Sequence, residues 1–143
     1  MAHIVATISN SPGNQETRVQ SGPVVKTINL PAKPEGGSDF NGGEMLCLAL
    51  ATCYCNDLYR EAAVRKIAIN SVTVEASADF ERIGEAGSNF RYLVSVDGAA
   101  SRAVLEELVR HTDTVAEIQK TIRRGVEIAF IPGPFKTTAS DPA

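Results

Sequence analysis

The three cysteines of this 143-residue chain lie in one short segment, and thiols are its strongest candidates for covalent chemistry. Cys47, Cys53 and Cys55 fall within GGEMLCLALATCYCNDLYREAAVRKI, whose pattern predicts one long helix. Each helical residue advances by about 100° and 1.5 Å, so Cys53 and Cys55 point to opposite sides, and Cys47 lies about 9 Å along the axis from Cys53. A disulfide needs close Cα atoms and converging Cβ vectors. We therefore predict that no two of these thiols are bonded within the helix.

A thiol in this segment is either a small buried hydrophobe or a nucleophile. Cys53 has Leu50 and Asp57 as helical neighbours, so it lies on a largely apolar face, where most free cysteines are inert. Cys47, within MLCLAL, is predicted to be a core residue. Cys55 stands where the polar half of the helix begins, so the pattern does not decide whether its side chain is buried or exposed. The residue pattern alone leaves Cys53 with both interpretations.

Metal and cofactor sites are not predicted. A zinc site needs Cys and His at characteristic spacing with four ligands in all, whereas the only histidines, His3 and His111, are isolated from the cysteines. The glycine pairs at 36–37 and 42–43 lack the lysine and spacing of a phosphate-binding loop. We expect neither a metal nor an organic cofactor.

The composition excludes several classes of function. The net charge is −3 and no basic stripe is present, which argues against a nucleic-acid partner. No apolar run reaches the roughly 18 residues that span a bilayer, so no membrane association is expected. The N-terminal residues show no signal peptide, and an odd number of crowded cysteines is not a secreted disulfide framework. A reducing cytoplasm is the expected location.

Strands are predicted on the N-terminal side of the helix. Alternation of apolar and polar residues predicts strands over His3–Ser9, Thr17–Gln20 and Val24–Leu30, with a turn cluster at Asn10–Gln15. A loop rich in proline and glycine follows over Pro31–Gly43. Loops of this length in small domains are often functional.

The cysteine segment has the signals of a buried helix over Asn41–Ile67. Asn41 with Glu44 has the spacing of a capping box. Met45–Ala51 is apolar on every side, which is typical of a helix that is buried all round. A chain of this size cannot easily surround such a helix with its own elements, which predicts a homodimer built round it.

The C-terminal half is predicted to contain strands and helices. Strands over Ile67–Phe80 and Asn89–Val96, joined by the loop Glu81–Ser88, are expected to form an antiparallel pair. Ser101 is a predicted N-cap for a helix with an apolar face. The chain is therefore predicted to be one α+β domain over 1–143.

Three further elements are predicted near the end of the chain. Thr114 with Glu117 has capping-box spacing for a short helix that ends at Gly125. Val126–Phe130 is predicted to be a last strand, and residues 132–143 a loose tail.

The order of these elements and one local motif resemble the OsmC/Ohr family of osmotically inducible protein C and organic hydroperoxide resistance proteins. After the glycine-rich loop, GGEMLCLALATCY is similar to the family pattern P-E-E-L-L-x-A-A-x-A-A-C, with Cys53 at the terminal cysteine. The resemblance extends to Thr27–Leu30 and to Thr121–Val126 and covers most of the chain. It implies antiparallel sheets around a long buried central helix, in an intertwined homodimer with sites at the subunit interface.

The resemblance also implies a set of site residues. Cys53 matches the peroxidatic cysteine, which attacks an organic hydroperoxide while an arginine and a glutamate hold its thiolate. Arg18 is the only arginine before the helix and is the candidate cation. Glu44, one residue after the family's glutamate position, is the candidate acid and equally a helix cap. Ala116 stands where the family has its second, resolving cysteine.

The resemblance thus implies a thiol-dependent peroxidase that reduces organic hydroperoxides in oxidative stress defence, with an atypical site that lacks the second cysteine. Cys53 would be the nucleophile, and its reactivity, greater than that of Cys47, would require a lowered pKa. The sulfenic acid would be resolved by Cys55 as an auxiliary thiol, by a small-molecule thiol or by a dithiol protein. The alternative is a non-catalytic homologue that binds a small apolar ligand at the dimer interface.

Overall fold

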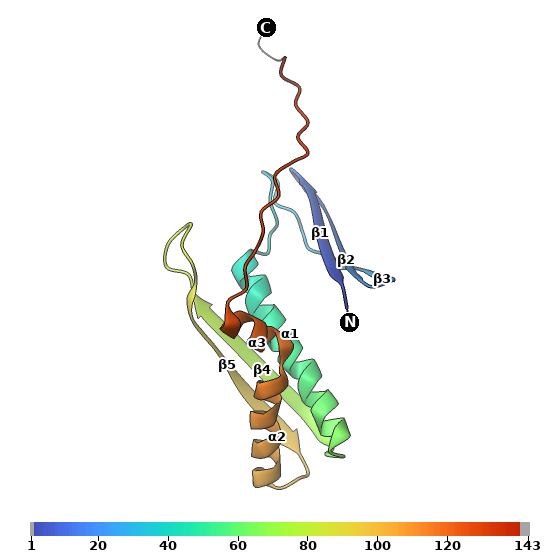
Figure 1. The fold of residues 1–143 in the computed structure, drawn as a ribbon, viewed down its shortest axis with the longest axis vertical. Coiled ribbons are helices and arrows are strands. Elements are labelled where there is room, and N and C mark those ends of the chain that lie inside the picture. The colour runs from blue at the N-terminus through green and yellow to red at the C-terminus, as the bar shows by residue number, and fades with distance from the viewer. Residues whose placement is uncertain (1, 141–143) are drawn as a thin grey trace.

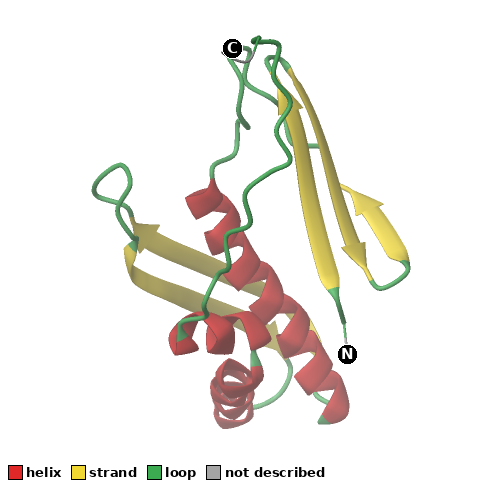
Figure 2. Ribbon diagram, turned by 45° about the horizontal axis from the view of Figure 1, so that its top comes forward, coloured by secondary structure: helices red, strands yellow, loops and turns green. Residues whose placement is uncertain are grey.

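The computed structural model describes residues 2–140 and shows the predicted α+β architecture (Figure 1). Its elements in chain order are β1 (Ile4–Ser11), β2 (Asn14–Ser21), β3 (Val24–Thr27), α1 (Gly42–Val64), β4 (Ile69–Asp79), β5 (Ser88–Gly98), α2 (Arg102–Val115) and α3 (Glu117–Arg124). The strands form two antiparallel sheets, one of order β1-β2-β3 and one of the pair β4-β5. Helix α1 lies between them (Figure 2).

The N-terminal sheet is larger than the sequence predicted. β1 and β2 pair along their whole length, from Ile4 opposite Ser21 to Ser11 opposite Asn14. Only two residues remain for the turn, and the second, Gly13, has a φ of 78° that favours glycine. Conversely, β3 ends at Thr27 rather than at Leu30.

This sheet is attached to the rest of the chain mainly through the loop that follows it. The Asn10 side chain donates a hydrogen bond to the Gly37 carbonyl at 3.1 Å, and the Gln15 side chain donates to the Leu30 carbonyl at 3.1 Å. The sheet stands away from α1 rather than packing along it (Figures 1 and 2). One consequence is that Ile4, Ile8 and Val24 are exposed within a single chain.

Helix α1 begins as predicted and ends slightly earlier. The Asn41 side chain accepts from the Glu44 N–H at 2.8 Å, and the Glu44 carboxylate accepts from the Asn41 N–H at 3.4 Å, which confirms the capping box. The helix ends at Val64, because Lys66 adopts a φ of 56° that no helix continues.

The first half of α1 is not enclosed by its own chain. Met45 and Cys47 are half-buried and Leu48 is 56% exposed, since the three-stranded sheet does not cover them. Within residues 2–140, no helix combines the length and the apolar character needed to cross a membrane.

The second half of α1 packs in the core against the β4-β5 hairpin, α2 and α3. The antiparallel pairing of β4 with β5 is confirmed, with Val72 opposite Val96 and Val74 opposite Val94. Ser101 accepts from the Val104 N–H and caps α2 as predicted. The fully buried core residues come from α1, α2 and the α2–α3 junction: Tyr54, Leu58, Ala62, Leu108 and Ala116.

The predicted cap of α3 is wrong. Thr114 belongs to the last turn of α2, where its hydroxyl donates to the His111 carbonyl at 2.6 Å. Ala116 is the N-cap residue of α3, without a side-chain cap. The C-terminal prediction is confirmed, because Gly125 follows the last turn with a φ of 65°.

The predicted strand over Val126–Phe130 is also wrong for the single chain. This segment runs as an extended coil away from α3 (Figure 1). Val126, Ile128 and Phe130 are 63%, 90% and 88% exposed. The alternation that predicted the strand is present, but within residues 2–140 no neighbouring strand pairs with this segment.

Candidate functional site

Cys53 lies at the contact between α1 and the N-terminus of α3. Its side chain is half-buried, and the Ile118 N–H donates to its sulfur at 3.5 Å. Ile118 is in the first turn of α3, where free N–H groups favour a negatively charged partner. Cys53 is too far along α1 to benefit from that helix's own N-terminus, so α3 provides the helix-terminal contact.

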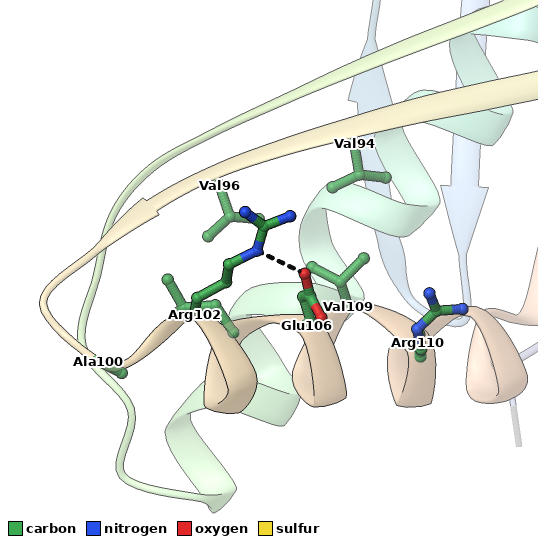
Figure 3. Close-up of a pocket in the computed structure, with 8 residues that line it drawn as sticks. Val94, Val96, Ala100, Arg102, Glu106, Val109 and Arg110 are labelled. Atoms are coloured by element: carbon green, nitrogen blue, oxygen red, sulfur yellow. Dashed lines mark hydrogen bonds and ion pairs between the residues drawn. The ribbon is translucent and has the colours of Figure 1, made fainter.

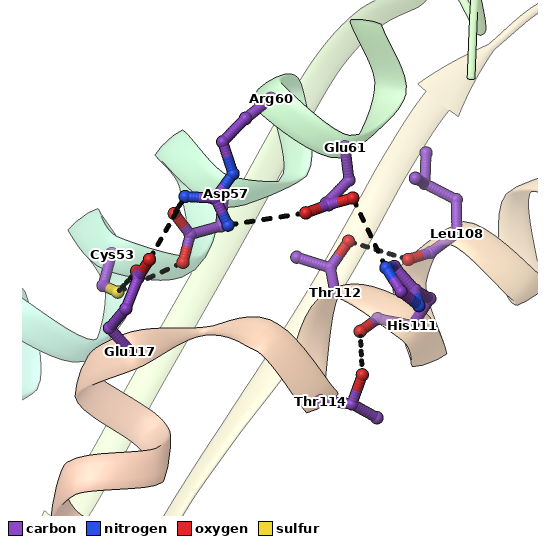
Figure 4. A network of polar contacts seen from close by, with 9 residues as sticks. All are labelled: Cys53, Asp57, Arg60, Glu61, Leu108, His111, Thr112, Thr114 and Glu117. Carbon is purple, nitrogen blue, oxygen red and sulfur yellow. Dashed lines mark hydrogen bonds and ion pairs between the residues drawn. The ribbon is translucent and has the colours of Figure 1, made fainter. Parts of the chain in front are cut away.

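Two carboxylates face the same sulfur. The Cys53 thiol donates to Asp57 Oδ2 at 3.4 Å and lies 3.9 Å from Glu117 Oε2 (Figure 4). Asp57 is four residues along α1 from Cys53, on the same helical face, and it is buried. Glu117 is the first residue of α3. The thiol is therefore held as a hydrogen-bond donor between groups that can accept its proton.

Arg60 links the two carboxylates. Its Nη1 lies 2.9 Å from Asp57 Oδ1 and 3.3 Å from Glu117 Oε1. Its Nη2 lies 3.5 Å from Glu61, whose other carboxylate oxygen is 3.3 Å from His111 Nε2 (Figure 4). The cluster of Cys53, Asp57, Arg60 and Glu117, here called the thiol network, joins α1 to α3 around the sulfur.

The thiol network raises the pKa of Cys53 above its ordinary value. Burial is the main cause, and the negative charges of Asp57 and Glu117 add to it. The hydrogen bond from the Ile118 N–H acts in the opposite direction and lowers the pKa. In a single chain the thiol is thus more strongly protonated than a free cysteine, which is opposite to the lowered pKa predicted for a reactive Cys53.

The two carboxyl groups of the network differ in acidity. Burial raises the pKa of Asp57, although its hydrogen bond from Cys53 and the charge of Arg60 lower it. The pKa of Glu117 is lowered, first by a hydrogen bond to its own backbone N–H and then by hydrogen bonding to Asp57 and the charge of Arg60. The network therefore makes Asp57 a stronger base, and Glu117 a weaker base, than the same carboxylates in water.

The arrangement suits acid–base chemistry at sulfur better than metal binding. The ligand atoms of Cys53, Asp57 and Glu117 lie within 4.8 Å of one another, a grouping that could surround an ion. Both carboxylates, however, already pair with Arg60, whose guanidinium provides the positive charge that a cation would add. We therefore describe the cluster as an ion-pair network and assign no metal to it.

The structure does not bring Arg18 or Glu44 to Cys53 within one chain. Arg18 lies on β2, opposite Thr7 and Thr27, in the sheet that stands apart from α1. Glu44 is engaged in the capping box at the start of α1, roughly 13 Å along the helix axis from Cys53. Among the described residues, neither makes a hydrogen bond or ion pair to the thiol network.

The other two thiols lie apart from the network. All three cysteines are free and half-buried, which confirms that none pairs within the helix. Cys55 lines a shallow pocket of about 280 Å³ with Thr52 and Val74, on the side of α1 that faces β4. It therefore points away from Cys53 and α3, as the helical geometry predicts.

Asp57, Arg60 and Glu117 were not predicted as site residues. The spacing of Asp57 and Arg60, four and seven positions after Cys53, places both on its helical face and could have indicated them. No local pattern could indicate Glu117, because it is 64 residues away in sequence. It is nevertheless adjacent to Ala116, the position that the family resemblance assigned to a second thiol.

A larger cavity lies elsewhere in the structure. It has a volume of about 650 Å³ between β5 and α2, with an apolar floor that includes Val94 and Val96 (Figure 3). Arg102 and Glu106 form an ion pair of 2.8 Å at its edge. Cys53 is not among its lining residues, and none of them makes a hydrogen bond to Cys53, so the candidate site rests on the chemistry of the thiol network rather than on cavity size.

The raised pKa predicts how Cys53 responds to alkylating agents. Only the thiolate reacts, and the Cys53 pKa lies above its ordinary value of 9.0. Alkylation should therefore be slow at neutral pH and accelerate about tenfold for each pH unit until the pKa is reached. Peptide mapping after timed iodoacetamide treatment at several pH values checks this, with Cys47 quantified in the same digest. A rate that is already constant at pH 7 would contradict it.

A protein-family comparison adds to this geometry. The model described as OsmC-like protein matches residues 35–130, which is more than half of the chain and includes α1, the β4-β5 hairpin, α2 and α3. No curated protein matches the chain.

Several solved structures share the fold. An OsmC-like protein from Mycoplasma pneumoniae is 12% identical, with a TM-score of 0.58 and coverage of 83% of this chain and 87% of that chain. An organic hydroperoxide resistance protein from Elizabethkingia anophelis, solved with bound thiocyanate, is 15% identical, with a TM-score of 0.55 and coverage of 82% and 86%. A protein from Vibrio cholerae described in the same terms, solved with captopril in one of its active sites, is 18% identical, with a TM-score of 0.57 and coverage of 85% and 84%. At these identities the likeness concerns the fold.

Proposed function

Because this chain belongs to the family of OsmC-like proteins, we propose that it reduces organic hydroperoxides with Cys53 as the attacking thiol. Two of the structural neighbours are described as organic hydroperoxide resistance proteins, which supports this substrate class. The observation that carries the proposal is the thiol network itself. One sulfur atom lies against two carboxylates and an N–H of a helix N-terminus, and a guanidinium pairs with both carboxylates.

The proposed reaction has two stages. The sulfur of Cys53 attacks the terminal peroxide oxygen, the O–O bond breaks, and the products are a cysteine sulfenic acid and an alcohol. Ala116 occupies the position of a second cysteine, and its buried methyl group cannot resolve the sulfenic acid. We propose that an external thiol does so, first as a mixed disulfide and then by a second exchange that restores Cys53.

The test of this function is hydroperoxide consumption with an added thiol. Protein at micromolar concentration is mixed with cumene hydroperoxide, and peroxide loss is followed with either a monothiol or dithiothreitol present. Turnover should depend on the thiol. Without the thiol, one equivalent of peroxide per chain should be consumed in forming the sulfenic acid, and further consumption should be limited to the second equivalent that excess peroxide uses in forming the sulfinic acid. Peroxide consumption no faster than in buffer would contradict the proposed function.

We also propose that the functional unit is a homodimer. Apolar side chains on three separate elements are left exposed by the single chain: Leu48 on α1, Ile4 and Ile8 on β1, and Ile128 and Phe130 in the coil after α3. The coil also retains the alternation of a strand that lacks a partner. A second copy would cover these surfaces, and it would allow Arg18 of the partner subunit to approach Cys53.

The dimer is tested by its mass in solution. Light scattering at micromolar protein should give about twice the chain mass of 15.2 kDa. Ile128→Asp should shift the mass toward the monomer, because a charge replaces an apolar side chain at the buried contact. Ile83→Asp, in an exposed loop outside that surface, is the matched control and should remain dimeric. A monomeric parent protein would contradict the proposal.

The raised pKa of Cys53 favours a second candidate, a non-catalytic homologue that binds a small apolar ligand at the dimer interface. Such a protein needs an apolar binding surface that excludes water, and it does not need a thiolate. The two candidates differ in one result. A non-catalytic homologue leaves Cys53 unoxidised when cumene hydroperoxide is in excess, whereas a peroxidase oxidises it.

A further inference from the structure

Asp57 is the one carboxylate of the thiol network that is buried, and it accepts the hydrogen bond from the Cys53 thiol at 3.4 Å. From this geometry we propose that Asp57 takes the proton of Cys53 during attack on a hydroperoxide and returns it to the alkoxide that leaves. The inference rests on the proposed function and adds a catalytic residue to it.

The chemistry requires such a group. A thiol that is protonated at neutral pH must lose its proton before or during attack. The alkoxide that departs from a hydroperoxide is strongly basic and must gain one. A carboxylate beside the sulfur can perform both transfers, and positioned groups of this kind typically accelerate a reaction by about 10²–10⁴-fold.

The step balances as follows. The Cys53 proton moves to Asp57 Oδ2, and the sulfur electron pair forms an S–O bond to the terminal oxygen as the O–O bond breaks. The departing oxygen takes the proton from Asp57 and becomes an alcohol. Sulfur is oxidised from thiol to sulfenic acid, the peroxide is reduced by the same two electrons, and Asp57 returns to its ionised form.

The surrounding charges determine whether Asp57 can act as a base. Arg60, 2.9 Å from Oδ1, stabilises the ionised carboxylate, whereas Glu117 opposes it. Glu61 lies on the far side of Arg60 and reaches His111 of α2. The hairpin strand β4, which also packs on α1, contributes no hydrogen bond or ion pair to this group among the described residues. Arg60 is thus a positioning residue whose charge favours the ionised form of Asp57, against the burial that raises its pKa.

The experiment compares two reactions of the same thiol in Asp57→Asn. Reaction with cumene hydroperoxide at pH 7 should slow by roughly 10²-fold, because no carboxylate transfers the proton. Alkylation by iodoacetamide should instead become several-fold faster, because a negative charge beside the sulfur is gone and the iodide that leaves needs no proton. A purely structural role of Asp57 would change both rates in the same direction.

Two further variants control for charge. Glu117→Gln removes a negative charge at 3.9 Å from the sulfur but leaves Asp57 in place, so both rates should rise. Glu61→Gln removes a carboxylate that contacts Arg60 but not the thiol, and neither rate should change by more than about twofold. If the hydroperoxide rate fell as much in Glu117→Gln as in Asp57→Asn, the proton transfer could not be assigned to Asp57, and the inference would be overturned.

Arg60→Gln provides a test that does not depend on the folding of Asp57→Asn, because Arg60 is half-exposed at the surface. Without the guanidinium the pKa of Asp57 should rise, since the Arg60 charge lowers it. The acid limb of the hydroperoxide rate should then move to higher pH, while the rate at alkaline pH is kept. An unmoved acid limb overturns the inference, as does an unchanged hydroperoxide rate in a folded Asp57→Asn. Parent protein inert toward hydroperoxide would instead refute the proposed function, and this inference with it.

Discussion

Cys53→Ser should reduce the rate of hydroperoxide consumption by roughly 10³-fold or more, to the rate in buffer, because a serine hydroxyl cannot form a sulfenic acid. Cys47→Ser is the matched control, since it changes the same atom on the same helix outside the thiol network, and it should retain the parent rate. Peroxide loss with added dithiothreitol measures both. Equal activity of parent and Cys53→Ser would show that another group reacts.

The parent protein should give a defined oxidation product at Cys53. One equivalent of hydroperoxide should leave a sulfenic acid on Cys53 that a 1,3-dione traps, and excess oxidant should convert it to sulfinic acid. No intrachain disulfide should form, because Cys55 faces β4 and Cys47 lies about 9 Å along the helix. Intact mass spectrometry separates these species. If the intact mass fell by two hydrogens and peptide mapping located a Cys53–Cys55 disulfide, helix α1 would have to be broken at this point.

Leu58→Ala should destabilise the protein by about 2–5 kcal/mol, the second large effect that we expect. Leu58 is fully buried in the core with Tyr54 and Leu108. Truncation removes buried apolar surface and leaves a cavity that the surrounding helices cannot fill. Urea unfolding followed by circular dichroism gives the free energy of unfolding, and protein concentration is held constant because a dimer's stability depends on it.

Val64→Ala is the control for this measurement. Val64 is on the same helix but is 74% exposed, and a surface substitution usually changes the free energy of unfolding by no more than about 0.5 kcal/mol. If Leu58→Ala were as stable as Val64→Ala, the core between α1 and α2 would be packed differently from the structure described above.

The thiol network shows why the site was only partly predictable. Cys53 could be predicted as a candidate because residue type and the local motif indicate it. Asp57 and Arg60 follow from helical periodicity, since both repeat on the face of Cys53. Glu117 and the Ile118 N–H come from a helix more than 60 residues away, and no local pattern encodes that contact.

Elements whose signals are local could be predicted from the residues alone. The capping box at Asn41 and Glu44, the Ser101 cap and the antiparallel β4-β5 pair depend on residues close in sequence. Where a strand needs a distant partner, local signals were insufficient. Val126–Phe130 has the alternation of a strand but remains a coil, because strand formation requires a neighbour to satisfy its backbone groups.

The electrostatic environment of Cys53 depends on how distant elements pack around it. The family resemblance implied Arg18 as the cation, and a reactive thiol was predicted to have a lowered pKa. In the described chain, burial and the nearby carboxylates of Asp57 and Glu117 raise the pKa of Cys53 instead. A pKa is set by burial and by charges within a few ångströms. Those charges come from whichever elements pack together, and packing is a property of the whole fold rather than of the segment that contains the cysteine.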